Sequence, residues 1–181
     1  QALRSELGPT QFCNDLLNED GSLREKGPQH LFFDSRAPEV LYSGAMGAGK
    51  SIIGCLKIWH LALQYPGARF AIIRKVKASL AATTKETFWQ LVADRDLVRG
   101  RDKTEDWVEV GYPGKRPSRI WWFGLDPDPI TGAPSKVGGF EGSAIFVDEA
   151  IELSEVDWLM LLGRLRDSRM PWHQLMAATN P

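Results

Sequence analysis

The chain has 181 residues, enough for one well-packed domain but too few for two domains of ordinary size. Its composition is 43% hydrophobic and 25% charged, which is typical of globular proteins. The formal net charge of −1 argues against a uniformly basic DNA clamp, although a local basic patch would suffice for nucleic acid. No apolar run reaches the ~20 residues of a membrane span, so no membrane partner is expected. Cys13 and Cys55 lack zinc-ligand spacing.

Helices and strands alternate along most of the chain. Residues 1–27 are polar and predict a helical extension with one short helix at 9–17. From residue 28 on, the pattern predicts helices at 28–35, 51–64, 81–93 and 156–165, and strands at 39–42, 69–73, 107–110, 119–125, 144–147 and 174–178. Residues 111–118 join two strands as a hairpin, and residues 126–142 are predicted to be a loop. The sequence thus predicts an α/β domain at 28–181: a mainly parallel sheet flanked by helices, with an added β-hairpin.

The run GAMGAGKS at residues 44–51 matches the phosphate-binding loop pattern GxxxxGK[ST]. Glycines let several backbone N–H groups approach phosphate oxygens, and the following helix directs its positive end at the same anion. Lys50 supplies charge for the outer phosphates, and the Ser51 hydroxyl can ligate Mg²⁺. A chance glycine-rich turn is the minor alternative, because the run lies between a predicted strand and a predicted helix. The nucleotide-binding residues predicted here are Gly44, Ala45, Met46, Gly47, Ala48, Gly49, Lys50, Ser51 and Ile52.

Two acids, Asp148 and Glu149, follow the apolar strand at 144–147. Ligands of open α/β sheets bind at the carboxyl ends of strands, so we assign Asp148 to Mg²⁺ and Glu149 to the attacking water. Helix capping by both acids is the alternative, and the loop upstream favours the catalytic interpretation. The second acid also favours a hydrolase over a nucleotide kinase, which needs no base to activate water.

The chain ends with Thr179, Asn180 and Pro181 after a third apolar strand. Polar groups there could contact the γ-phosphate or the attacking water. Taken alone, the Asn-Pro pair favours an ordinary turn.

The features that carry a family resemblance are Gln29, the segments EVLYSGAMGAGKS and AIFVDEA, the helix end GRLR at 163–166, and the final AATNP. With these features together, the chain resembles the ATPase domain of tailed-phage terminase large subunits. The resemblance covers residues 28–181. The loop and the acidic pair occur in many ATPases, whereas the order and spacing with the upstream glutamine and the downstream TNP are more specific. The resemblance implies a P-loop NTPase of the ASCE or RecA-like type. It also implies that ATP hydrolysis with Mg²⁺ drives viral double-stranded DNA into procapsids.

The resemblance also implies roles for single residues. Gln29 matches the glutamine that reads the adenine edge, and Arg74 lies where these proteins often carry a basic residue near the nucleotide. Thr179 and Asn180 match the motif that couples hydrolysis to movement, and the strand that carries it is expected between the P-loop strand and the Walker B strand. The expected catalytic residues are Lys50, Arg74 and Glu149, and the expected metal ligands are Ser51 and Asp148.

The implied assembly is a homo-oligomeric ring on the procapsid in the host cell cytoplasm, with double-stranded DNA, the portal protein and the small terminase subunit as partners. The arginine that many terminases carry before a glycine upstream of the Walker B aspartate is absent, since residues 137–139 read VGG. Lys136, Arg164 and Arg166 are candidates to replace it, and we expect a single subunit to hydrolyse ATP slowly. Terminases continue beyond the coupling motif into a nuclease domain, so the chain is expected to be a fragment that does not cut DNA.

Two basic segments, residues 95–103 and 115–119, could contact DNA phosphates, although for each alone a solvated loop surface is favoured. Two other functions remain as alternatives to a packaging motor. One is a superfamily 2 helicase-like translocase, which also has an Asp-Glu-Ala sequence but needs a second RecA-like domain. The other is a nucleotide-switched binding module, against which Glu149 argues.

Overall fold

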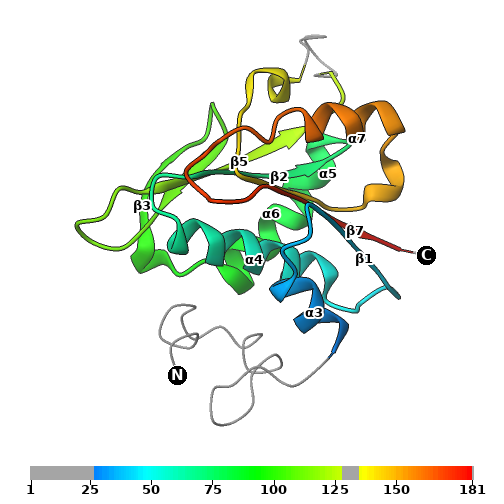
Figure 1. Cartoon of the computed structure of the whole chain (residues 1–181), viewed down its shortest axis with the longest axis horizontal. Coiled ribbons are helices and arrows are strands. Elements are labelled where there is room, and N and C mark those ends of the chain that lie inside the picture. Colours follow the sequence, from blue (N-terminus) through cyan, green and yellow to red (C-terminus); the bar gives the residue numbers. More distant parts are fainter. Residues whose placement is uncertain (1–26, 128–134, 181) are drawn as a thin grey trace.

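The computed structural model describes residues 27–127 and 135–180. The predicted helix at 9–17, nearly all of the extension at 1–27, and Pro181 lie outside the described residues. One sheet of seven strands in the order β1-β7-β6-β2-β5-β4-β3 forms the centre of the fold (Figure 1). The strands are β1 (Glu39–Ser43), β2 (Arg69–Arg74), β3 (Val98–Asp102), β4 (Trp107–Val110), β5 (Ser118–Gly124), β6 (Ala144–Val147) and β7 (Gln174–Thr179).

Five neighbouring strands, from β1 to β5 in the spatial order, pair in parallel, while β5, β4 and β3 pair antiparallel. The predicted mainly parallel sheet with an added hairpin is therefore confirmed. The helices are α3 (Pro28–Asp34), α4 (Lys50–Gln64), α5 (Lys77–Ala82), α6 (Thr84–Thr87) and α7 (Glu155–Leu162). No helix among the described residues is long and apolar enough to cross a membrane.

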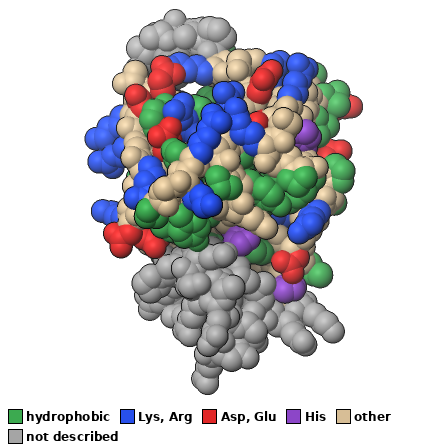
Figure 2. Space-filling model, turned by 60° about the vertical axis from the view of Figure 1, so that its left-hand side comes forward, with side chains coloured by type: hydrophobic (Ala, Val, Ile, Leu, Met, Phe, Trp, Pro, Cys, Tyr) green, Lys and Arg blue, Asp and Glu red, His purple; other side chains and the backbone are tan. Residues whose placement is uncertain are grey.

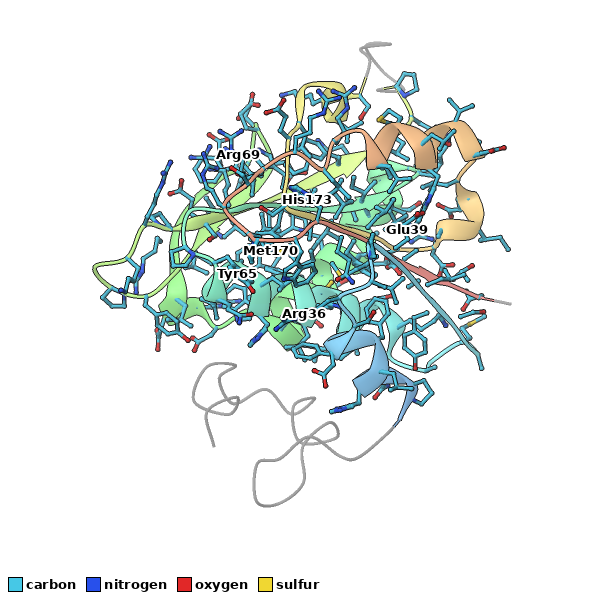
Figure 3. The ribbon with its side chains drawn as sticks, viewed as in Figure 1. Arg36, Glu39, Tyr65, Arg69, Met170 and His173 are labelled. Atoms are coloured by element: carbon cyan, nitrogen blue, oxygen red, sulfur yellow. The ribbon has the colours of Figure 1, made fainter. Side chains whose placement is uncertain are left out.

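Helices cover both faces of the sheet, which explains why its central strands are continuous apolar runs. Helices α3, α4 and α6 lie on one face, and α7 lies on the other (Figure 1). In β6, Phe146 belongs to the core cluster on the α4 side, whereas Ile145 and Val147 belong to the cluster on the α7 side. Glu39, at the start of β1 (Figure 3), accepts a hydrogen bond from the Trp158 indole of α7 at 2.6 Å, which fastens α7 over the edge strand.

The structure corrects two predicted elements. Residues 98–102, predicted as part of a solvated loop, form β3 and pair with β4. This strand lies at the sheet edge with half-buried or exposed residues, so it carries no apolar run. The helix predicted at 81–93 begins at Lys77 instead, breaks at Thr83 (φ −127°, ψ −75°), and ends in a π-helical turn over Phe88–Val92. The predicted loop at 126–142 contains a 3₁₀ turn at Lys136–Gly139, while residues 128–134 lie outside the described residues.

Helix α4 approaches β6 so closely that only glycine fits at the contact. A Cβ atom built on Gly54 would lie 2.1 Å from the Phe146 ring. Phe146 is fully buried, and its ring is enclosed by the α4-side core. Gly54 therefore sets the distance between the P-loop helix and the strand that leads to the acidic pair.

We expect Gly54→Ala to lower the free energy of unfolding by roughly 1–3 kcal/mol, because overpacking outweighs the gain in helix propensity. Urea unfolding measures this. Gly138→Ala is the matched control, since a Cβ there meets no heavy atom within 4 Å. Equal stability of the two variants would show that α4 can move away from β6 at no cost.

Candidate functional site

Four chain segments meet at the carboxyl edge of the parallel strands. The P-loop follows β1, the acidic pair follows β6, Asn180 follows β7, and Arg74 ends β2. Strand β7 lies between β1 and β6, which confirms the strand order that the terminase resemblance implied. The site is thus assembled where ligands of open α/β sheets bind.

The P-loop has the backbone conformation that its glycines permit. Gly47 and Gly49 adopt positive φ values of 79° and 70°. Gly49 caps α4 without any side-chain hydrogen bond to the first turn. The leading N–H groups of the 15-residue helix α4 therefore remain available for an anion, as a phosphate site requires. Ala45 and Met46 are exposed at the loop tip, and Ile52 is half-buried in the first turn of α4.

Lys50 is nearly buried, with 8% of its surface exposed. Its ammonium group donates hydrogen bonds to the carbonyl oxygens of Gly44 and Ala45, each at 2.8 Å. The charge of Lys50 is thereby held at the loop itself, beside the uncapped helix end. This is the position from which a lysine can neutralise phosphate oxygens.

Ser51 and Asp148 come into direct contact although they are 97 positions apart. The Ser51 hydroxyl donates to Oδ1 of Asp148 at 2.9 Å, and Asp148 is 4% exposed. A hydroxyl and a carboxylate are the hard oxygen ligands that Mg²⁺ takes from a protein when phosphates supply others. No group of three or more His, Cys, Asp or Glu among the described residues could hold a metal ion. The Ser51 hydroxyl and the Asp148 carboxylate are the chemistry that fits a metal whose other ligands come from phosphate.

Glu149 has φ 54° and ψ 53°, a left-handed conformation that is uncommon for a residue with a side chain. Its two carboxylate oxygens accept hydrogen bonds from the Asn180 amide at 3.3 and 3.1 Å. Thr179, one residue earlier, accepts a hydrogen bond at its carbonyl from the backbone N–H of Gly44 at 3.4 Å. The end of β7 thus contacts both the P-loop and the second acid.

The side chain of Arg74 is held by two partners. Its guanidinium donates to the Thr83 hydroxyl at 2.9 Å and forms an ion pair with Glu152 at 3.3 Å. These contacts fix the direction of its guanidinium. Its catalytic role remains a prediction.

Gln29 lies beside the P-loop, and its contact with adenine remains a prediction. Its side-chain amide donates to the carbonyl oxygen of Ala48 at 2.8 Å. The helix α3 that carries Gln29 is attached to α4 by a buried lysine, because Lys57 donates to the carbonyls of Phe32 at 2.8 Å and Ser35 at 2.6 Å. Burial lowers the pKa of Lys57 to about 8, although the charge of Asp34 acts in the opposite direction.

The three candidates for the missing arginine have different surroundings. Lys136 pairs with Glu105 at 3.0 Å, and Arg164 donates to the carbonyl of Gly138 at 2.6 Å. Arg166 is exposed. The arrangement within one chain favours none of them as a group acting on a neighbouring subunit.

Sequence reasoning missed Lys57, Gly54 and Thr84. Thr84 is buried, and its hydroxyl donates to Oδ2 of Asp148 at 2.6 Å. A lysine inside an apolar helix was a usable signal for Lys57, since lysine is rarely buried without partners. No local signal marks Gly54 or Thr84, because their partners lie 92 and 64 positions away along the chain.

Lys57 makes the stability of the fold depend on pH above neutrality. Its pKa is about 8 in the folded chain, against ~10.4 for an unperturbed lysine. Between these values the unfolded chain binds more protons, so stability rises with pH there, and the full cost of the buried charge applies below this range. In urea unfolding we expect wild type to gain stability relative to Lys57→Met as pH rises from ~7 to ~9.5. A pH-independent difference would contradict this.

No family model and no curated protein matches the sequence. Solved structures of the large terminase from the thermophilic bacteriophage D6E are similar to the chain. One matches 85% of the chain with a TM-score of 0.66 at 17% sequence identity. The complexes of that terminase with ATP-gamma-S and with ADP each match 85% with a TM-score of 0.62 at 16% identity. The chain covers only 37–38% of those terminase chains. At this identity the likeness concerns the fold: the chain has the fold of the corresponding part of a phage large terminase.

Proposed function

We propose that the chain binds ATP with Mg²⁺ and hydrolyses it. The observation that carries the proposal is the contact between the P-loop hydroxyl of Ser51 and Asp148 at 2.9 Å, with Glu149 next in sequence. A phosphate loop, a metal-ligating pair and a second acid at one sheet edge are the parts that NTP hydrolysis requires. The terminase that shares this fold has been solved in complex with ATP-gamma-S and with ADP.

Each part has a distinct role in the proposed reaction. The uncapped N–H groups of α4 and the ammonium of Lys50 bind the phosphate oxygens and neutralise charge that develops on them. Ser51 and Asp148 would hold Mg²⁺, which would supply further positive charge at the phosphates. Glu149 orients water and accepts its proton on a carboxylate oxygen as the water attacks the γ-phosphorus, and ADP leaves. Gln29 contacts the adenine edge with the side-chain oxygen that its bond to Ala48 leaves free.

The contact between Asn180 and Glu149 supports a coupling role for the end of β7. The same short segment bonds to Gly44 through the Thr179 carbonyl and to Glu149 through the Asn180 amide. A change in the P-loop or in the protonation of Glu149 therefore alters hydrogen bonds made by one strand end. Such a segment can link the state of the nucleotide to the position of β7.

We further propose that hydrolysis drives movement of double-stranded DNA, with the chain as one subunit of a homo-oligomeric ring at a procapsid portal in the host cell cytoplasm. This proposal rests on the fold shared with a terminase and on a basic surface at the edge strand β3. Figure 2 shows Lys and Arg side chains spread over the side that carries β3. A groove of about 470 Å³ on this side is lined by Trp89, Arg95, Val98, Arg99, Gly100 and Arg101.

The arginines of this groove are suited to phosphate contacts. Arg95, Arg99 and Arg101 are exposed, and within residues 27–127 and 135–180 none of them forms an ion pair. Arg99 donates to the carbonyl of Gly111 at 2.8 Å, which orients its guanidinium. Guanidinium groups without a carboxylate partner, on β3 and in the turn before it, can release counterions from DNA without reading bases. The portal protein and the small terminase subunit would contact other surfaces of the assembly.

Two substitutions separate binding from chemistry. We expect Glu149→Gln to keep nucleotide affinity within about twofold while lowering the hydrolysis rate at least ~100-fold, because it removes the base alone. Lys50→Ala should abolish nucleotide binding. Fluorescent ADP binding and phosphate release measure the two properties. Unchanged hydrolysis in Glu149→Gln would remove Glu149 as the base, and wild-type binding without turnover would favour the nucleotide-switched binding module.

The basic groove predicts salt-dependent DNA binding. We expect Arg95→Ala with Arg101→Ala to weaken duplex binding equally for unrelated sequences and to reduce the salt slope by about 2. Fluorescence anisotropy over a salt series measures both. Arg36→Ala removes the same kind of charge beside α3, away from the hairpin (Figure 3), and should leave the slope unchanged. Identical slopes for all the proteins would exclude this surface as the one facing DNA.

A further inference from the structure

The carboxylate of Asp148 accepts hydrogen bonds from two hydroxyl groups, one on helix α4 and one on helix α6. Oδ1 accepts a hydrogen bond from Ser51 at 2.9 Å, and Oδ2 accepts one from Thr84 at 2.6 Å. Asp148 is 4% exposed and Thr84 is 1% exposed. Among the described residues, these are the hydrogen bonds that the Asp148 side chain makes. Each oxygen therefore has one donor, and water hardly reaches either.

Thr84 reaches Asp148 because the helix before it breaks. Helix α5 ends at Ala82, Thr83 is not helical, and α6 begins at Thr84. At this corner the Thr83 hydroxyl turns to Arg74, while the Thr84 hydroxyl turns inward to Asp148. Cys55 of α4 lies against the Thr84 carbonyl, with its sulfur 3.9 Å from the oxygen. Thr84 is thus fixed between α4 and the end of β6.

The hydroxyl groups of Ser51 and Thr84 would respond differently when nucleotide and metal bind. Ser51 belongs to the P-loop helix, and as a metal ligand it would present an oxygen lone pair to the cation. Thr84 belongs to another helix and points at Oδ2 with a proton, because a carboxylate can only accept. Its bond to Oδ2 would persist if Oδ1 became a metal ligand. A buried carboxylate oxygen without a donor is costly, so the bond to Thr84 fixes the rotation of the carboxylate.

We propose that Thr84 is a positioning residue of the Mg²⁺ site: it holds Oδ2 of Asp148 so that Oδ1 is the oxygen presented beside Ser51. This inference rests on the proposed function, since it concerns the metal used with the nucleotide. Thr84 does not touch the phosphates or the metal. It acts through Asp148, as partners behind metal ligands generally do.

The test measures binding rather than turnover. Fluorescent ADP is titrated at increasing Mg²⁺ concentration, and the Mg²⁺ concentration that gives half of the gain in affinity is compared among variants. Thr84→Val keeps the shape and removes the hydroxyl, so we expect about a tenfold higher Mg²⁺ requirement and unchanged ADP affinity in EDTA. Thr84→Ser keeps the donor and should restore the wild-type requirement. Thr87→Val is the matched control on α6, since the Thr87 hydroxyl makes no hydrogen bond within the described part of the chain.

Several results would overturn the inference. One is a wild-type Mg²⁺ requirement in Thr84→Val, and another is an equal change in Thr87→Val. If Thr84→Val does not fold, Thr84→Cys offers a weaker donor of similar shape and should give an intermediate requirement. A wild-type value for Thr84→Cys would then contradict the role. If Mg²⁺ does not alter ADP affinity in the wild-type protein, the proposed function fails together with the inference. Normal Mg²⁺-dependent hydrolysis with an unchanged Thr84→Val overturns the inference alone.

Discussion

The close packing of α4 on β6 is the constraint on which the site depends. Gly54 faces the buried Phe146 ring so closely that the contact leaves no room for a Cβ atom. Because α4 begins at the P-loop and β6 ends at the acidic pair, this packing brings Ser51 within 2.9 Å of Asp148. A P-loop alone binds phosphate. The approach of the two elements makes the loop one half of the proposed metal site.

The order of the strands supplies the rest of the site. Strand β7 is the last in the described sequence, yet it lies between β1 and β6. Its end therefore reaches Gly44 on one side and Glu149 on the other. A base held by an amide from a neighbouring strand is sensitive to any shift between these strands. The same topology that completes the sheet thus places Asn180, proposed to act in coupling, beside Glu149, the proposed base.

A buried lysine holds the helix that carries Gln29, the residue proposed to contact adenine. Lys57 satisfies the carbonyl oxygens of Phe32 and Ser35 at the carboxyl end of α3, where a positive charge also suits the helix dipole. The lowered pKa of Lys57 reflects the cost of burying this charge. The bonds to the two carbonyls offset part of that cost, and they keep α3, with Gln29, against the P-loop helix.

The sequence by itself determined the parts whose signals are local. The P-loop, the apolar strands β2, β6 and β7, the hairpin of β4 and β5, and the acids after β6 could all be predicted, because each depends on neighbouring residues and their spacing. The terminase resemblance added the position of β7. Only the tertiary structure decided that Val98–Asp102 pairs as an edge strand and that the helix breaks at Thr83. It also decided that Thr84 donates a hydrogen bond to Asp148 and that Gly54 packs against the Phe146 ring. These features depend on contacts between residues far apart in the chain, and packing creates such contacts only when the sheet and helices are assembled.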